Sequence, residues 1–220
     1  MRLYERLKPR IMADIIGQPQ ATGPLSAFLL EPYPNIIMLE GPTGTGKSTC
    51  AAVIARELTE PDGFGDHKII GANLKTEAAE ALFGWDSPFR YRCMNGKFHV
   101  LRIEELERLP VNVQGYLKEA LEDAQRRYRL VVVATSNGTA AIRDKALLHR
   151  FQRHVFHAGP AFAKAFNDWL EMLWIAETGK WPPPDGFEAW GYDDDTEFSG
   201  RLALDRMERA LVERKGMVKA

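Results

Sequence analysis

The sequence predicts an α/β fold in which helices sandwich a parallel five-stranded sheet, followed by a small α-helical region. In residues 1–158, short apolar or β-branched runs alternate with longer stretches of helical periodicity. This alternation is typical of βαβ units whose sheet is buried on both faces. In residues 159–220 only helical spacing remains. With 220 residues, 45% of them hydrophobic, the chain is long enough to form both parts.

The individual strands and helices can be placed along the chain. The spacing predicts strands at residues 35–40, 68–70, 98–103, 130–135 and 154–157. It predicts helices at residues 48–58, 77–82, 111–123, 161–176 and 198–215. Between the last two helices, residues 179–195 form a Pro- and Trp-rich insertion that resists regular structure. This insertion either folds back on its own helices or offers its aromatic side chains to a partner.

The overall composition excludes several classes of protein. The 29 basic and 30 acidic residues nearly cancel, so any contact with nucleic acid must be local. Cys50 and Cys93 lack metal-binding spacing, and so few thiols suit a reducing compartment. No apolar run approaches the roughly 18 residues that span a bilayer, and the first ten residues lack the apolar core of an export signal. We therefore expect a cytoplasmic protein with no membrane contact.

A glycine-rich stretch follows the first predicted strand and precedes a predicted helix. It matches the pattern G-x-x-x-x-G-K-[ST] of a P-loop NTPase. In such a loop Lys47 reaches the outer phosphates, Ser48 binds Mg²⁺, and the helix presents its positive end to the anion. A glycine-rich turn without a ligand would have no evident use for this lysine and hydroxyl. The residues expected to bind ATP here are Gly41, Pro42, Thr43, Gly44, Thr45, Gly46, Lys47, Ser48 and Thr49.

Two adjacent acids end the predicted strand 98–103. Burial of this strand would deliver the carboxylates of Glu104 and Glu105 to the sheet edge at which ligands bind in open α/β folds. We assign Glu104 to Mg²⁺ and Glu105 to polarising the attacking water. The alternative is that both acids cap the next helix, and they could serve both purposes.

The opening segment adds a resemblance to a known family. Residues 4–10 and 14–18, YERLKPR and DIIGQ, resemble the "EKYRPK…DIVGQ" segment of the AAA+ ATPases, in the clamp-loader and Holliday-junction-motor branch. In that family the segment wraps the adenine, which implies contacts from Leu7, Pro9, Ile15 and Ile16. Leu7 and Lys8 replace the usual Tyr-Arg of the family. A plain N-terminal arm is the alternative, because a residue before proline favours extended backbone.

Three further motifs occur in the family's order. Residues 131–137 resemble the strand that ends in the sensor 1 residue, which implies that role for Asn137, although Asn is also common in turns. Residues 146–151, ALLHRF, resemble the box whose arginine reaches a neighbouring subunit's ATP. This implies a trans-acting finger at Arg150, with Arg153 as the second choice; a solvated arginine is the alternative. Residues 199–205 are similar to the lid sequence that carries the sensor 2 arginine, here Arg201.

The sequence also departs from the family. Glu104 stands where Asp is usual, and the insertion interrupts the helical lid. Clamp-loader subunits continue into a helical collar domain, whereas this sequence ends at residue 220. We expect that a stable ring would need other contacts or other subunits.

The resemblance implies an oligomeric ATPase that uses ATP and Mg²⁺. We expect a ring or spiral of identical or related AAA+ subunits, clamp-loader-like, that acts on DNA or on a sliding clamp in replication or repair. Basic residues at 125–129 and 143–154 could meet phosphates or simply face solvent.

Two rival functions stay open. Residues 80–89 and 109–114 faintly resemble the loop and helix of sigma-54 activators, in which an exposed loop grips a protein. Equally, Phe83, Trp85 and Phe89 could pack against the sheet. The third alternative is a binding-only subunit that lends Arg150 to a partner and hydrolyses ATP slowly.

Overall fold

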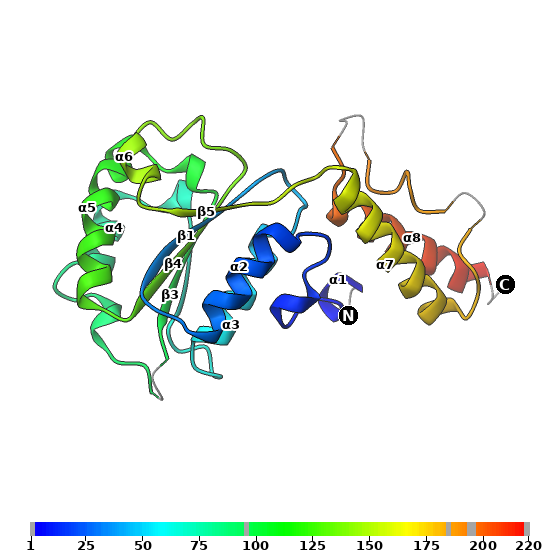
Figure 1. Ribbon diagram of the computed structural model, residues 1–220, viewed down its shortest axis with the longest axis horizontal. Coiled ribbons are helices and arrows are strands. Elements are labelled where there is room, and N and C mark those ends of the chain that lie inside the picture. Colours follow the sequence, from blue (N-terminus) through cyan, green and yellow to red (C-terminus); the bar gives the residue numbers. More distant parts are fainter. Residues whose placement is uncertain (1–2, 95–96, 184–185, 193–196, 218–220) are drawn as a thin grey trace.

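The chain forms two lobes that lie next to each other along the longest axis of the molecule (Figure 1). One is an α/β lobe, and the other is a smaller helical lobe, which we call the lid. This arrangement is seen in the computed structural model, which describes residues 3–94, 97–183, 186–192 and 197–217. No described helix combines the length and apolar character needed to cross a bilayer.

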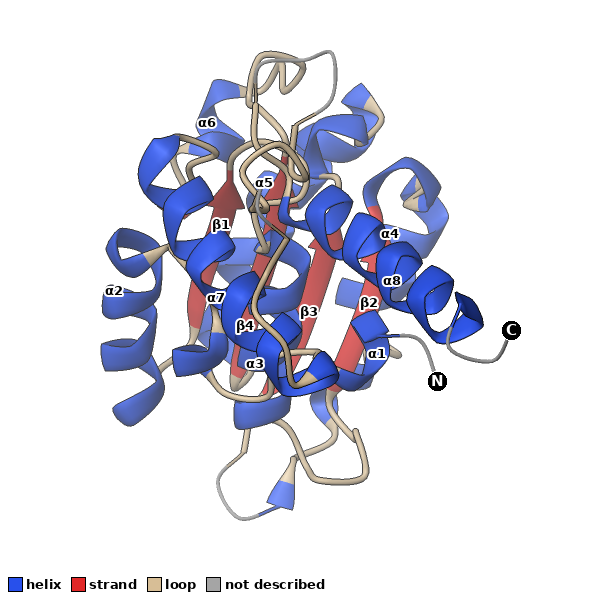
Figure 2. Cartoon of the chain, turned by 90° about the vertical axis from the view of Figure 1, so that its right-hand side faces the viewer, coloured by secondary structure: helices blue, strands red, loops and turns tan. Residues whose placement is uncertain are grey.

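The α/β lobe contains one parallel sheet with the strand order β2-β3-β4-β1-β5. The pairs Glu40–Ser136 and Ile70–Glu104 place the carboxyl ends of the strands at a common edge (Figure 2). The predicted five-stranded sheet is confirmed, although β2 starts two residues earlier and β5 lies two residues closer to the N-terminus than expected. The strands are β1 (Asn35–Glu40), β2 (Asp66–Ile70), β3 (His99–Glu104), β4 (Leu130–Ser136) and β5 (Gln152–Val155).

Helices cover both faces of the sheet, with α4 and α5 on one side and α2 and α3 on the other (Figure 1). In the α/β lobe the helices are α2 (Pro19–Leu30), α3 (Lys47–Leu58), α4 (Thr76–Phe83), α5 (Val111–Arg127) and α6 (Lys145–Leu148); in the lid they are α7 (Pro160–Thr178) and α8 (Gly200–Met217). The short N-terminal helix α1 (Leu3–Arg6) packs against α8, and Leu3 joins the core of the lid. Neighbouring strand residues point to opposite faces. Ile36 and Met38 therefore join the core under α5, whereas Ile37 and Leu39 join the core under α3.

Helix α2 was not predicted, because residues 22–24, Thr-Gly-Pro, are typical of a turn. The helix begins at Pro19, where the missing N–H is not needed, and continues through Pro24. Leu25 and Phe28 bury one face of α2 in the core that contains Ile37. Burial of this face therefore outweighs the local sequence preference.

The insertion packs on the lid where it is described. Phe187 is 1% exposed and contacts Trp174 and Trp190, with ring centroids 5.8 and 4.7 Å away. Trp181 is 85% exposed, although its carbonyl oxygen accepts a hydrogen bond from the Trp174 indole. Residues 184–185 and 193–195 of the predicted insertion lie outside the described residues. The fold-back alternative is thus supported at Phe187 and Trp190.

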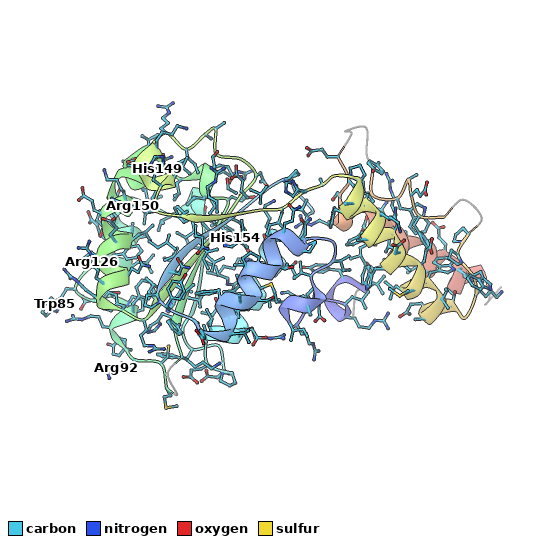
Figure 3. All side chains as sticks on the ribbon, viewed as in Figure 1. Trp85, Arg92, Arg126, His149, Arg150 and His154 are labelled. Atoms are coloured by element: carbon cyan, nitrogen blue, oxygen red, sulfur yellow. The ribbon has the colours of Figure 1, made fainter. Side chains whose placement is uncertain are left out.

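The segment after α4 divides its aromatic residues between core and surface. Phe89 is buried and Phe83 packs partly against the same core, as expected. The expectation for Trp85 was wrong, because its side chain is 81% exposed at the outer edge of the lobe (Figure 3). The guanidinium of Arg90 lies 4.4 Å from the indole centroid, so a cation–π contact orients the ring without burying it.

Candidate nucleotide site

Strand β1 leads directly into the glycine-rich loop, and the loop leads into α3. Gly41, Gly44 and Gly46 have φ angles of 150°, 82° and 100°, which favour glycine. A Cβ atom on Gly41 would lie 2.1 Å from the carbonyl oxygen of Phe156, so the segment after β5 fixes the loop closely. Because α3 begins at Lys47, its unpaired N–H groups and positive end face the loop. These features together form an anion cradle.

Lys47 lies inside this cradle and is 7% exposed. Its ammonium donates hydrogen bonds to the carbonyl oxygens of Gly41 and Pro42, both at 2.6 Å, and to Oδ1 of Asn137 at 3.0 Å. These contacts engage all three donors of the ammonium with uncharged oxygens. An incoming phosphate would replace neutral acceptors with charged ones, which favours binding.

The electrostatic surroundings of Lys47 also favour an anion. Burial lowers the pKa of Lys47 to about 8, while the negative charge of Glu107 opposes this shift and the positive charge of Arg201 adds to it. The shift reflects an ammonium whose charge is poorly compensated in the folded protein. A phosphate group would supply that compensation.

The lid contributes the start of α8 to the same place. The backbone N–H of Gly200 donates to the carbonyl oxygen of Gly44 at 3.2 Å. A Cβ atom on Gly44 would lie 2.1 Å from Oγ of Ser199. The positive ends of α3 and α8 therefore meet at Gly44, and the exposed Arg201 follows in the first turn of α8. Figure 2 shows α7 and α8 in front of the sheet.

Asn137 connects Lys47 to an acid that the sequence analysis did not select. Its Nδ2 donates to Oε1 of Glu107 at 3.0 Å, and its Oδ1 accepts from Thr43 at 3.3 Å as well as from Lys47. Asn137 follows β4, and Glu107 lies in the 3₁₀ turn Leu106–Arg108 after β3. The structure thus confirms that Asn137 lies beside the cradle, and its sensor role stays a prediction.

Glu104 and Glu105 reach the expected edge of the sheet but hold other partners. Oε2 of Glu104 lies 2.9 Å from Nζ of Lys68, and Oε2 of Glu105 lies 3.1 Å from Nη1 of Arg108. Glu105 has φ 57°, a left-handed backbone that costs a non-glycine residue about 1–2 kcal/mol, and its N–H donates to Oγ1 of Thr135. Partly exposed ion pairs of this kind contribute only about 0–1 kcal/mol. Bound nucleotide could therefore release both carboxylates.

The side chains assigned to Mg²⁺ suit that ion chemically. Ser48 is exposed, and its hydroxyl makes no hydrogen bond within the described part of the chain. Together with Glu104 it offers only oxygen donors, which Mg²⁺ prefers. The described residues contain no cluster of three or more His, Cys, Asp or Glu that could hold a metal alone.

A cavity of about 540 Å³ opens next to the cradle. Gly41, Pro42 and Asn137 line one side, Arg153 and the segment after β5 line the other, and Glu197 of the lid completes it. The volume falls in the range of small-molecule sites. Nε of Arg153 donates to Glu40 at 3.0 Å, so this arginine belongs to the chain's own site.

The predicted adenine contacts lie outside this cavity, near the junction of the two lobes. Ile15 is buried, and its Cγ2 would lie 4.0 Å from a Cβ atom on Gly46. Leu7 and Ile16 pack partly against the lid core, while Pro9 is half-buried. The structure therefore brings Ile15 to the cradle and Leu7 and Ile16 to the lid. Their contact with adenine stays a prediction.

Arg150 lies on the side of the α/β lobe that faces away from the lid (Figure 3). Its Nη1 lies 2.6 Å from Oε1 of Glu122, and the two side chains are 38% and 37% exposed. Arg150 is thus remote from the chain's own cradle, as expected of a finger that acts on a neighbour.

Sequence reasoning missed two contributors to the site. Glu107 is the third acid of the run Glu-Glu-Leu-Glu, and its spacing from Glu105 could have drawn attention to it. The backbone contact between Gly200 and Gly44 has no side-chain signal and requires the folded lid.

Comparisons with known proteins bear on the family and the fold of the chain. Residues 37–158 match the family described as the ATPase family associated with various cellular activities (AAA). The Holliday junction branch migration complex subunit RuvB of Lacticaseibacillus casei is 31% identical over 130 residues, covering 56% of this chain and 34% of that protein. The replication factor C small subunit of Haloarcula marismortui is 25% identical over 210 residues, covering 94% of this chain and 62% of that protein.

A solved structure extends the likeness to the whole fold. The RuvB Holliday junction branch migration motor of Thermotoga maritima superposes with a TM-score of 0.71 at 22% identity, covering 97% of this chain and 68% of that chain. The chain spans about a third of the RuvB relative's length and about three fifths of the replication factor's length. Since the family pattern covers more than half of the sequence, this chain belongs to the AAA ATPases, in the branch of the Holliday junction motors and clamp loaders.

Proposed function

We propose that this chain binds Mg²⁺ and ATP at the Gly41–Ser48 loop and hydrolyses ATP within a ring or spiral of like or related subunits. The observation that carries the proposal is the convergence of a buried ammonium, the positive ends of α3 and α8, and Arg201 on one glycine-rich loop. This is a preorganised site for a polyphosphate.

The side chains of the site suggest a division of roles. Lys47 would exchange its carbonyl partners for phosphate oxygens, and Arg201 would neutralise charge from the lid side. Ser48 and Glu104 would hold Mg²⁺, which offsets charge on the phosphates when bound. Glu105 would leave Arg108 and polarise the attacking water. Asn137 would help to orient that water or the terminal phosphate.

Substitutions in the cradle test the binding and the chemistry separately. We expect Lys47→Ala to abolish nucleotide binding, because it removes the buried cation. We expect Glu105→Gln to leave binding intact and to remove turnover. Equilibrium binding of a fluorescent ATP analogue and phosphate release measure the two effects. Hydrolysis retained by both variants would overturn these assignments.

The distance of Arg150 from its own cradle supports action between subunits. We expect Arg150→Ala to retain ATP binding and to lose hydrolysis, since a guanidinium supplied in trans is worth about 10³-fold or more in related phosphoryl transfers. Mixing it with Lys47→Ala should restore part of the activity. Arg126→Ala, an exposed arginine one turn from Glu122, is the matched control. If mixing never restores activity, Arg150 does not act in trans.

The work done with ATP is proposed from the relatives. One relative, RuvB, is named as a subunit of the Holliday junction branch migration complex, and the other is named as the small subunit of replication factor C. We propose a cytoplasmic, clamp-loader-like ATPase that acts on DNA or on a DNA-bound protein ring such as a sliding clamp. The test is whether ATP turnover rises with primed or branched DNA, alone or with a clamp. No response to any DNA, with a response to a protein, would redirect the assignment.

One observation favours a protein substrate as the second candidate. Trp85 is exposed on the loop that resembles the protein-gripping loop of sigma-54 activators. Exposed tryptophan and arginine are typical of interface hot spots. If this candidate holds, Trp85→Ala should abolish stimulation by a protein substrate and leave basal ATP turnover unchanged. The ion pairs of Glu104 and Glu105 also suit a binding-only subunit, which slow hydrolysis by every assembled form would indicate.

A further inference from the structure

Glu107 is the acid whose carboxylate is connected to the cradle in this structure. Oε1 accepts the hydrogen bond from Nδ2 of Asn137, and its charge acts on Lys47. Oε2 is buried and has no hydrogen-bond partner among the described residues. A buried carboxylate oxygen without a donor costs about 1–3 kcal/mol or more, so a donor in the completed site would relieve it.

The contacts fix the orientation of the Asn137 amide. A carboxylate only accepts hydrogen bonds and an ammonium only donates them. Nδ2 of Asn137 must therefore face Glu107, and Oδ1 must face Lys47 and Thr43. Lys47 already disfavours rotation of the amide by half a turn, because the amide NH2 would then face an ammonium that cannot accept. Glu107 adds the second contact, which holds Nδ2 and so fixes the position of the amide from its other end.

The same contacts limit what can satisfy Oε2. The three donors of Lys47 are all engaged with Gly41, Pro42 and Asn137. Neither Glu104 nor Glu105 can donate while ionised. A water molecule is therefore the simplest donor that the completed site can provide.

We propose that Glu107 is a positioning residue of the nucleotide site, which orients Asn137 through one oxygen and holds a water molecule through the other. The proposal rests on the proposed ATP hydrolysis and deepens it. Glu104 and Glu105 keep their assigned roles, and Glu107 sets the geometry in which Asn137 and Lys47 meet the terminal phosphate. Misplacement of such a group by about 1 Å can cost about a hundredfold in rate.

Two substitutions at this position separate its hydrogen bond from its charge. Glu107→Ala removes both, so we expect kcat to fall about tenfold to hundredfold while KM changes less than about threefold. Glu107→Gln keeps an acceptor for Asn137 and loses the charge, so its kcat should fall less. A merely structural role would lower the stability of the chain but leave the kcat of the folded chain in place, so the change of kcat against KM separates the two roles.

If both Glu107 variants keep the wild-type kcat, the inference fails while the proposed function stands. If the wild-type chain binds no ATP, the proposed function itself fails. Should Glu107→Ala not fold, the nearly isosteric Glu107→Gln still decides the outcome, because its kcat must fall while its KM changes little.

Discussion

Raising the pH should weaken nucleotide binding through Lys47. Its pKa is about 8 in the nucleotide-free protein, well below the ordinary value of 10.5, mainly because the ammonium is buried. Bound phosphates favour the protonated form, so the affinity should be highest below pH 8 and should fall as the pH rises through that value. The phosphates themselves are mostly ionised from pH 7 upward, since the last pKa of a phosphate monoester lies at about 6.

The size of this effect follows from the protonated fraction of Lys47. With a pKa of about 8, roughly nine tenths of the ammonium is protonated at pH 7 and roughly one tenth at pH 9. The affinity for ATP should therefore fall about tenfold between these values, which corresponds to about 1.4 kcal/mol. Arg201→Gln should move the midpoint upward, because the guanidinium of Arg201 lowers the pKa of Lys47.

Titration of a fluorescent ATP analogue from pH 7 to 9.5 at constant ionic strength measures the midpoint. The contribution of Lys47 to folding stability also depends on pH, but it changes in the opposite direction to the affinity for ATP. Because the folded-state pKa of Lys47 is depressed, the unfolded chain binds more protons between pH 8 and 10.5, so Lys47 makes unliganded stability rise with pH in that window. Thermal unfolding without nucleotide monitors this contribution. An affinity that stays constant from pH 7 to 9.5 would refute the reasoning.

Two further predictions use matched positions in the chain. Gly44→Ala should weaken ATP binding about tenfold or more, because the added Cβ would lie 2.1 Å from Oγ of Ser199 and would displace the lid. Gly63→Ala is the control: it carries the same backbone strain at φ 86°, but its Cβ would meet nothing within 4 Å, so ATP binding should stay unchanged. Phe187→Ala should destabilise the chain by about 3–5 kcal/mol, because Phe187 is a buried aromatic residue. Trp181→Ala should destabilise it by less than about 1 kcal/mol, because Trp181 is exposed. Chemical denaturation would measure both free energies of unfolding. Equal effects within either pair would contradict the packing that the structure shows.

The sheet could be predicted from the sequence because buried parallel strands carry a strong local signal. Residues 130–135 form a continuous apolar and β-branched run, and the structure buries all of β4. The residues of the edge strands β2 and β5 are mostly half-buried or exposed, so the bounds of these strands were less well defined in the sequence. Helix α2 was not predicted because its Thr-Gly-Pro sequence opposes a helix locally, whereas Leu25 and Phe28 stabilise it through contacts with residues that are distant in the sequence.

The cradle could also be predicted from the sequence, since its glycines and Lys47 occur at fixed spacing in one segment. The lid contact could not be predicted, because it is a backbone hydrogen bond between Gly200 and Gly44, which are far apart in the chain. Sequence spacing reports local geometry, whereas such a contact depends on how two lobes pack. Glycine at position 44 is therefore required twice, once by its own φ of 82° and once by Ser199.

The acids after β3 show why a motif locates a site more reliably than it assigns roles within it. Glu104, Glu105 and Glu107 fall within four residues, but the chain turns sharply at Glu105, where φ is 57°. That turn sends consecutive carboxylates in different directions, two of them to cations outside the cradle and the third to Asn137. Local strain of this kind is commonly stored at functional sites. A change of backbone at Glu105 on nucleotide binding would redirect its carboxylate without moving β3, and it would leave Glu107 to hold Asn137 in place during that change.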